Sequence, residues 1–141
     1  MIPVEAKPSM QGAMQSILAT CNRDGTPNVT SVSQVWYVDP RHVAVSFQFF
    51  NKTSENLRDN PHASIRLFDP NGQDHWALDV EFVRAETTGP VFDDMEMQLE
   101  AIASMTGMTG VFKLRAAHIY EVLRIERLPL VRPEFLTSSS P

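Results

Sequence analysis

Cysteine, basic side chains and long apolar runs are all scarce in this chain of 141 residues. The single cysteine, Cys21, excludes an internal disulfide and any metal site built from several cysteines. The 12 lysines and arginines are outnumbered by 17 acidic residues, and the resulting net charge of -5 argues against broad nucleic-acid binding. No apolar run is long enough to cross a bilayer, and the first residues lack the apolar segment of a signal peptide. We therefore expect a cytoplasmic protein that binds neither nucleic acid nor membrane.

Common catalytic and metal-binding patterns are also missing. The 4 histidines lie on different predicted elements without the spacing of metal ligands, so we expect no metal site. No Ser-His-Asp order and no glycine-rich phosphate loop stands out. Cys21 lies on a predicted strand beside a turn, and nothing nearby is placed to activate its thiol. These patterns therefore identify no catalytic residue, and the catalytic residues stay unknown.

The composition is that of one globular domain. Apolar residues make up 43% of the chain and charged residues 21%, which is ordinary for a folded protein of this length. We expect a single domain over residues 1–141, with a core at about 9–128. The remaining residues, 129–141, have the composition of a flexible tail.

Alternating apolar and polar residues predict about six strands joined largely by hairpins. The expected strands are residues 17–22, 27–39, 43–50, 62–69, 75–87 and 118–128. Asp24-Gly25 is a strong hairpin signal between the first two. Helices are expected at residues 9–16, at 52–60 after the third strand, and at 91–107 before the last strand. Few strands and close turns favour an antiparallel barrel or sandwich, so the fold class is mainly β.

The stretch "FFNKTSENLRDNP", residues 49–61, contains residues that are suited to an anion-binding site. It connects the end of the third strand to a short helix that Pro61 ends. Lys52 supplies a positive charge, Thr53 a hydroxyl, and the first N–H groups of a helix point outward and favour anions. Taken by themselves, the same residues are better explained by an ordinary solvent-exposed helix start, with Thr53 or Ser54 as its N-cap.

Two blocks of the sequence together resemble the pyridoxamine 5'-phosphate oxidase-like proteins, the FMN-binding split barrels. The first block is "LATCNRDGTPNVTSV" and the second is "KTSENLRDNPHASI"; the resemblance extends over about residues 17–126. It implies an antiparallel six-stranded split β-barrel that binds FMN and forms a homodimer with the flavin at the subunit interface. By the same resemblance, Lys52 and Thr53 hold the FMN phosphate. The residues implied beside the ring and the ribityl chain are Ser33, Gln34, Val35, Trp36, Gln48, Phe49 and Phe50.

Simpler interpretations exist for several of these residues. Tryptophans such as Trp36 and Trp76 are more often core or interface anchors than residues that stack on a flavin. Trp76 and His75 are nevertheless our candidates for completing the site of a partner subunit. Asn56 and Asn60 are explained by a solvated helix face and a turn.

Three functions are consistent with the resemblance. The first is an FMN-dependent oxidoreductase that transfers electrons or hydride between flavin and a small substrate. The second is a non-catalytic module that binds or senses flavin, and the third is a split barrel that uses another cofactor, deazaflavin or haem, or none. The arginine-rich C-terminal segment of authentic pyridoxamine phosphate oxidase is absent, which argues against oxidation of vitamin B6.

Overall fold

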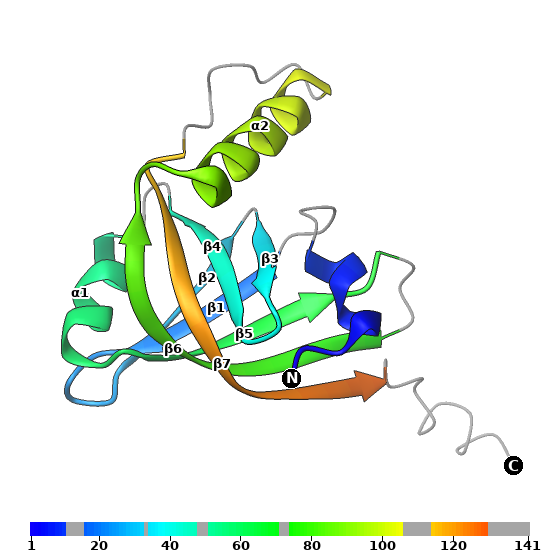
Figure 1. The fold of residues 1–141 in the computed structure, drawn as a ribbon. Coiled ribbons are helices and arrows are strands. Elements are labelled where there is room, and N and C mark those ends of the chain that lie inside the picture. The colour runs from blue at the N-terminus through cyan, green and yellow to red at the C-terminus, as the bar shows by residue number, and fades with distance from the viewer. Residues whose placement is uncertain (11–15, 33, 48–50, 71–73, 106–113, 130–141) are drawn as a thin grey trace, which may run out of the picture.

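The computed structural model describes residues 1–10, 16–32, 34–47, 51–70, 74–105 and 114–129 (Figure 1). Seven strands, two α-helices and one 3-10 helix lie in these ranges. In chain order they are η1 (Val4–Met10), β1 (Ser16–Cys21), β2 (Pro27–Val32), β3 (Val35–Asp39), β4 (His42–Phe47), α1 (Asn51–Asp59), β5 (His62–Phe68), β6 (Asp74–Glu86), α2 (Pro90–Met105) and β7 (Ala116–Pro129). None of the helices in the described ranges is long and apolar enough to span a membrane.

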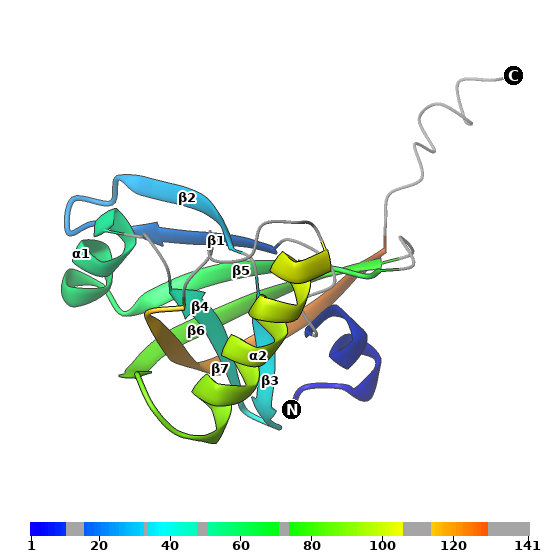
Figure 2. The ribbon, with the colours of Figure 1, turned by 90° about the horizontal axis from the view of Figure 1, so that it is seen from above.

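The strands form one antiparallel sheet that curls into an incompletely closed barrel. Their order is β2-β1-β5-β6-β7-β4-β3, so β2 and β3 lie at the two ends of the sheet. These two strands are consecutive in the chain, and only residues 33 and 34 separate them. Because the three residue steps from Val32 to Val35 span at most about 11 Å, the sheet has to curl until its two ends come close together. The result is an antiparallel barrel that is split between β2 and β3 (Figures 1 and 2).

The mainly β, split-barrel prediction is confirmed, but the number of strands is wrong. Residues 27–39, expected as one strand, form two: β2 pairs with β1, whereas β3 pairs with β4. Val32 and Val35 both point into the core, although three positions separate them. An uninterrupted strand would place such residues on opposite faces. The change of phase marks the bend, and no glycine or second proline announces it in the sequence.

The other predicted elements are confirmed to within two residues at every end that is described, except the first helix. A helix was expected at residues 9–16, but the structure has a 3-10 helix at Val4–Met10, and residues 11–15 lie outside the described ranges. Pro8 lies inside this helix and has no N–H to donate, which disfavours the α form. Ala6 and Met10 are 0% and 1% exposed, so η1 packs into the barrel core.

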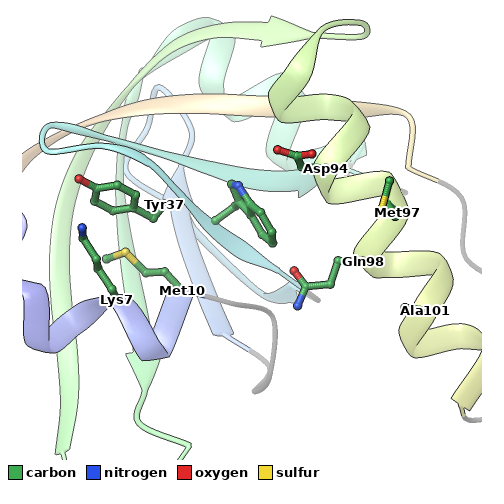
Figure 3. Close-up of a pocket in the computed structure, with 8 residues that line it drawn as sticks. Lys7, Met10, Tyr37, Asp94, Met97, Gln98 and Ala101 are labelled. Carbon is green, nitrogen blue, oxygen red and sulfur yellow. The ribbon is translucent and has the colours of Figure 1, made fainter.

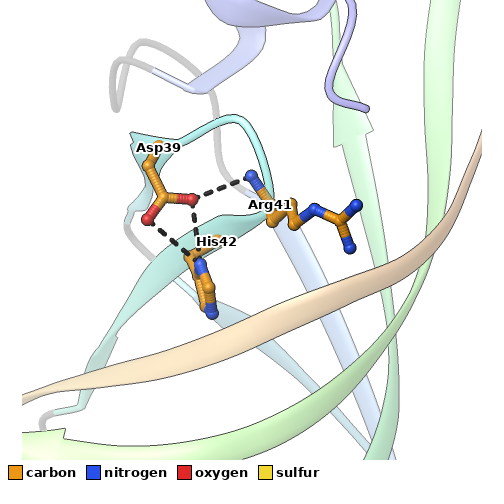
Figure 4. A network of polar contacts seen from close by, with 3 residues as sticks. All are labelled: Asp39, Arg41 and His42. Atoms are coloured by element: carbon orange, nitrogen blue, oxygen red, sulfur yellow. Dashed lines mark hydrogen bonds and ion pairs between the residues drawn. The ribbon is translucent and has the colours of Figure 1, made fainter.

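The predicted Asp24-Gly25 turn is confirmed, and a second tight turn joins β3 to β4. Gly25 has a φ of 83°, which suits glycine, and the Asn22 side chain accepts hydrogen bonds from the N–H groups of Asp24 and Thr26. Between β3 and β4, the Asp39 carboxylate accepts hydrogen bonds from the Arg41 N–H at 2.8 Å and from His42 Nδ1 at 2.9 Å (Figure 4). Partial desolvation raises the pKa of Asp39, but these hydrogen bonds outweigh it and the pKa is lowered.

Three helices cover different parts of the barrel. α1 lies at one side and η1 at the opposite side, while α2 lies above the strands (Figures 1 and 2). Met95 and Leu99 of α2 are buried in a cluster with Ala44, Ala117 and Ile119, which face outward from β4 and β7. The small alanines allow the helix to approach the strands closely, so α2 builds a second, smaller core outside the barrel.

Candidate functional site

The structure brings together two of the segments that the sequence placed at a cofactor site. The N–H of Ser46 donates to the Gln34 carbonyl at 3.2 Å, and the Gln34 N–H donates to Ser46 Oγ at 3.2 Å. The β2–β3 bend therefore lies beside the end of β4. From Phe47 the chain passes through residues 48–50 into α1, which begins at Asn51. Ser33, Gln48, Phe49 and Phe50 lie outside the described residues.

Lys52 and Thr53 lie in the first turn of α1. The predicted short helix after this strand is confirmed, and its first turn contains no acidic residue. The first N–H groups of an α-helix have no partner inside the helix and carry a partial positive charge. The side chains of residues 51–54 lie outside what is described, so contacts from Lys52 and Thr53 to a phosphate stay a prediction.

Two asparagines attach α1 to β1. Asn56 is 1% exposed, and its Nδ2 donates to Thr20 Oγ1 at 3.1 Å. Asn60 follows the helix, and its Nδ2 donates to Cys21 Sγ at 3.6 Å while its Oδ1 accepts from the His62 N–H at 3.1 Å. The solvated-face interpretation of Asn56 is thus wrong, whereas the turn expected at Asn60 is confirmed. Asn56 directly precedes the buried Leu57, and this position was the signal for its burial that the sequence analysis missed.

Val35 and its neighbours lie on the open edge of the barrel. The Val35 side chain is 1% exposed and belongs to the core, so contacts from Val35 to a ligand have to come from its backbone. Since Gln34 and Ser46 bond directly, the antiparallel alternation turns the N–H and C=O of Val35 away from β4. β3 is the last strand of the sheet, so these groups point to its open edge.

Gln34 is a buried amide with a free acceptor. The residue is 0% exposed, and its Nε2 donates to the Met95 carbonyl of α2 at 3.3 Å. Its Oε1 has no hydrogen-bond partner among the described residues. Buried polar atoms are nearly always paired in folded proteins. An acceptor left over beside the predicted ring segment fits a cofactor that offers an N–H group.

A cleft of about 730 Å³ opens between η1, β3 and α2 (Figure 3). Its described lining residues are Lys7, Met10, Trp36, Tyr37, Asp94, Met97, Gln98 and Ala101. Aromatic and thioether side chains dominate it, and the volume is in the range that holds a small ligand, about 300–1,000 Å³. Trp36, predicted beside the ring, is thus part of the wall of this cleft. The sequence did not indicate that η1 and α2 supply the other walls.

His118 lies in a separate aromatic group where β7 begins. Its ring stacks on Phe47 with the centroids 4.5 Å apart and meets Phe82 edge-on at 5.1 Å. Burial lowers the pKa of His118 to about 4, so the imidazole is neutral at physiological pH. A cavity of about 210 Å³ separates this group from Leu57 and Arg58 of α1. The pairing of His118 with Val45, which no local pattern predicts, places it here.

The Trp76 side chain packs within its own chain. Its indole is 5% exposed in the barrel core, and the guanidinium of Arg127 lies 5.7 Å from the ring. The expectation that Trp76 reaches the site of a partner subunit is therefore wrong for its side chain, and the core-anchor interpretation holds. His75 is half-buried, within 3.4 Å of Arg66. No cluster of three or more potential metal ligands occurs in the described ranges.

The curled antiparallel sheet, left unpaired between β2 and β3, defines the protein as a split β-barrel. The sequence profile of the pyridoxamine 5'-phosphate oxidase family matches residues 4–123. The chain therefore belongs to this family. No curated protein sequence matches it.

Solved structures share the fold at low sequence identity. An FMN-binding protein from Syntrophomonas wolfei is 17% identical with a TM-score of 0.71, over 92% of this chain and 88% of that one. An F420 reductase is 13% identical with a TM-score of 0.63, over 89% and 98%. HutZ, the heme storage protein of Vibrio cholerae, is 16% identical with a TM-score of 0.57, over 89% and 92%. These likenesses establish the fold alone.

Proposed function

We propose that this protein binds FMN, with the phosphate at the start of α1 and the isoalloxazine ring along Gln34–Trp36, in the cleft. The observation that carries the proposal is the pair of hydrogen bonds between Gln34 and Ser46, at 3.2 Å each. They hold the segment expected beside the ring against the strand that leads into the phosphate-binding turn. Membership of the pyridoxamine 5'-phosphate oxidase family supports the same cofactor.

The spacing along β3 suits the length of the cofactor. Trp36 is paired with Ala44, three residues before Phe47 at the end of β4. At about 3.3 Å per strand residue, this places Trp36 about 10 Å from the point where the chain leaves the sheet toward α1. The five-carbon ribityl chain of FMN separates its phosphate from its ring by a distance of this order. One flavin can then reach both the α1 turn and the cleft.

The residues of this chain would bind and orient the ring and supply its electrostatic surroundings. The open edge of β3 presents the backbone N–H and C=O of Val35, and the Gln34 Oε1 can accept an N–H from the polar edge of the ring. The bound flavin supplies electron or hydride transfer to or from a small substrate. We propose an FMN-dependent oxidoreductase that differs from pyridoxamine phosphate oxidase in its substrate.

The proposal is tested first by the phosphate. FMN and riboflavin differ only in this group, so Lys52→Ala should weaken FMN binding and leave riboflavin binding almost unchanged. A charge-assisted contact contributes about 1.5–3 kcal/mol, which corresponds to roughly a ten- to hundred-fold loss of affinity. Thr53→Ala should show a smaller loss, since a neutral hydroxyl contributes less. Titration of apoprotein with each flavin, followed by fluorescence quenching, measures both affinities.

Arg58→Ala is the matched control, because it removes a positive charge from the last turn of the same helix. It should leave the preference for FMN over riboflavin intact. Higher salt should weaken FMN binding to the parent more than to Lys52→Ala, because salt screens the charge of Lys52 and the variant lacks that charge. Equal losses for FMN and riboflavin in Lys52→Ala would instead support the solvent-exposed helix start. Turnover with a reduced nicotinamide separates an oxidoreductase from a flavin-binding module, and the absorbance spectrum identifies any other bound cofactor.

A further inference from the structure

One cation faces the cleft, among the described residues that line it. Lys7 lies on η1, and its Nζ is 4.3 Å from the centre of the Tyr37 ring (Figure 3). Within the described part of the chain, no carboxylate lies at ion-pair distance from this ammonium group. The cleft therefore contains a positive charge that lies against the face of an aromatic ring.

The position of Lys7 is set by the packing of η1. Ala6, one residue before it, is 0% exposed, and Met10, three residues after it, is 1% exposed. The Ile2 N–H donates to the Pro40 carbonyl at 2.9 Å, which ties the start of the chain to the β3–β4 turn. Because buried residues on both sides of Lys7 hold the backbone in place, the position of the Lys7 Cα is fixed. Its ammonium group can remain near Tyr37 at a small cost in backbone entropy.

A charge in this position distinguishes the redox states of a flavin. Oxidised flavin has an uncharged ring. Uptake of two electrons and one proton, with the proton on N5, leaves a ring with one negative charge, shared by N1 and the neighbouring carbonyl oxygen. A nearby ammonium group in a partly desolvated cleft stabilises this anion and has little effect on the neutral ring. The Asp94 carboxylate on the α2 wall acts with the opposite sign, and as an exposed group it is screened more strongly.

We infer that Lys7 makes the cleft selective for the reduced, anionic state of the flavin and so raises its reduction potential; this inference rests on the proposed function. η1, which carries Lys7, and α1, which carries Lys52, lie on opposite sides of the barrel (Figures 1 and 2), so the effect of Lys7 is separate from that of Lys52. The cleft is then a site for a planar ring that carries a negative charge, with Lys7 as the residue that decides the preference.

The test compares the affinities for oxidised and dithionite-reduced FMN, measured anaerobically at neutral pH, with the potential from a redox-dye titration as a second readout. Lys7→Gln should bind reduced FMN about ten-fold more weakly and oxidised FMN almost unchanged. For a two-electron couple a ten-fold change corresponds to about 30 mV, so the potential should fall by that amount. Lys7→Arg should keep the parental value. Asp94→Asn should shift the potential upward, by less.

Arg124→Gln is the charge-matched control on β7, where the guanidinium pairs with Glu126 and does not line the cleft. It should change neither affinity. Equal weakening of both redox states in Lys7→Gln, or no change in either, would overturn the inference while FMN binding by the parent still stood. Failure of the parent to bind FMN would overturn the proposed function and the inference with it. If Lys7→Gln does not fold by circular dichroism, the opposite shift expected of Asp94→Asn decides.

Discussion

Burial at a single residue, His118, changes the protonation of the folded chain. The side chain is 7% exposed, and its neighbours Phe47 and Phe82 are aromatic rings that offer no charge to compensate an imidazolium. Desolvation alone lowers its pKa from 6.5 to about 4. At neutral pH the folded protein therefore has an uncharged aromatic ring where the sequence shows an ionisable residue.

The pH dependence of stability follows from this lowered pKa. Above pH 6.5 the imidazole is neutral in both the folded and the unfolded chain. As the pH falls from 6.5 to about 4, the unfolded chain takes up a proton that the folded chain does not, so stability decreases. The loss is complete below about pH 4 and amounts to at most about 3 kcal/mol. Urea unfolding at pH 7.5 and at pH 4.5 should show it in the parent.

His118→Phe keeps an aromatic ring in the same stack and removes the titrating group. The free energy of unfolding of this variant should fall less between the two pH values, by about the amount assigned to His118. The exposed His62 provides a control, since His62→Gln should keep the parental pH dependence. An identical pH dependence in His118→Phe and the parent would contradict the assignment.

At the scale of elements, α1 is held by polar contacts as well as by apolar packing. Leu57 is 6% exposed and packs into the barrel core, and the Asn56–Thr20 hydrogen bond lies beside it. Both partners of this bond are buried, at 1% and 3% exposed. A buried amide that loses its hydrogen-bond acceptor carries a desolvation penalty. The placement of the proposed phosphate-binding helix therefore depends on a hydroxyl from β1.

Thr20→Val removes this hydroxyl and keeps the side-chain shape. We expect a loss of about 1–3 kcal/mol in the free energy of unfolding, because Asn56 Nδ2 is left buried without an acceptor. FMN affinity should fall more than riboflavin affinity if the start of α1 shifts. Thr20→Ser should restore both properties. Chemical denaturation and the two flavin titrations measure the effects.

Thr30→Val is the matched control, because the Thr30 hydroxyl bonds within its own strand, to the Ser31 carbonyl. It should change stability by less than Thr20→Val. A double-mutant cycle of Thr20→Val with Asn56→Leu isolates the pairwise term. A coupling energy near zero would show that the hydrogen bond does not hold the helix.

At the scale of the whole molecule, the split barrel leaves two strand edges open. β2 and β3 each pair with one neighbour in the sheet. Large apolar side chains are exposed nearby, with Val29 of β2 at 64% and Met97 of α2 at 68%. Open strand edges and exposed apolar groups are features that proteins usually cover by association.

We expect a homodimer in which a second chain completes each flavin site. Sedimentation at micromolar concentration should give twice the mass of the chain. If partner residues contribute to binding, the affinity for FMN should also decrease on dilution below the dimer dissociation constant. A stable monomer that binds FMN with undiminished affinity at all concentrations would contradict both the dimer and the shared site.

Local patterns in the sequence were sufficient for most of the elements. Alternation, the Asp24-Gly25 turn and Pro61 predicted the hairpins, the α1 helix and the mainly β class, because each is decided by neighbours in the chain. The resemblance carried by the two sequence blocks agreed with the family that the profile match establishes. Gln34, Val35 and Trp36 were indicated as a group, and the structure places this group beside the end of β4.

Contacts between distant segments were decided by the tertiary structure alone. The division of residues 27–39 into β2 and β3 depends on which strand each half pairs with. The local alternation of apolar and polar residues does not predict this pairing. Asn56 is buried because Thr20 lies opposite it, 36 residues away. Lys7 and Asp94 face one cleft because η1 and α2 both flank β3. A side chain's solvation is set by what the folded chain brings to it, so its burial and partners follow from the closure of the barrel.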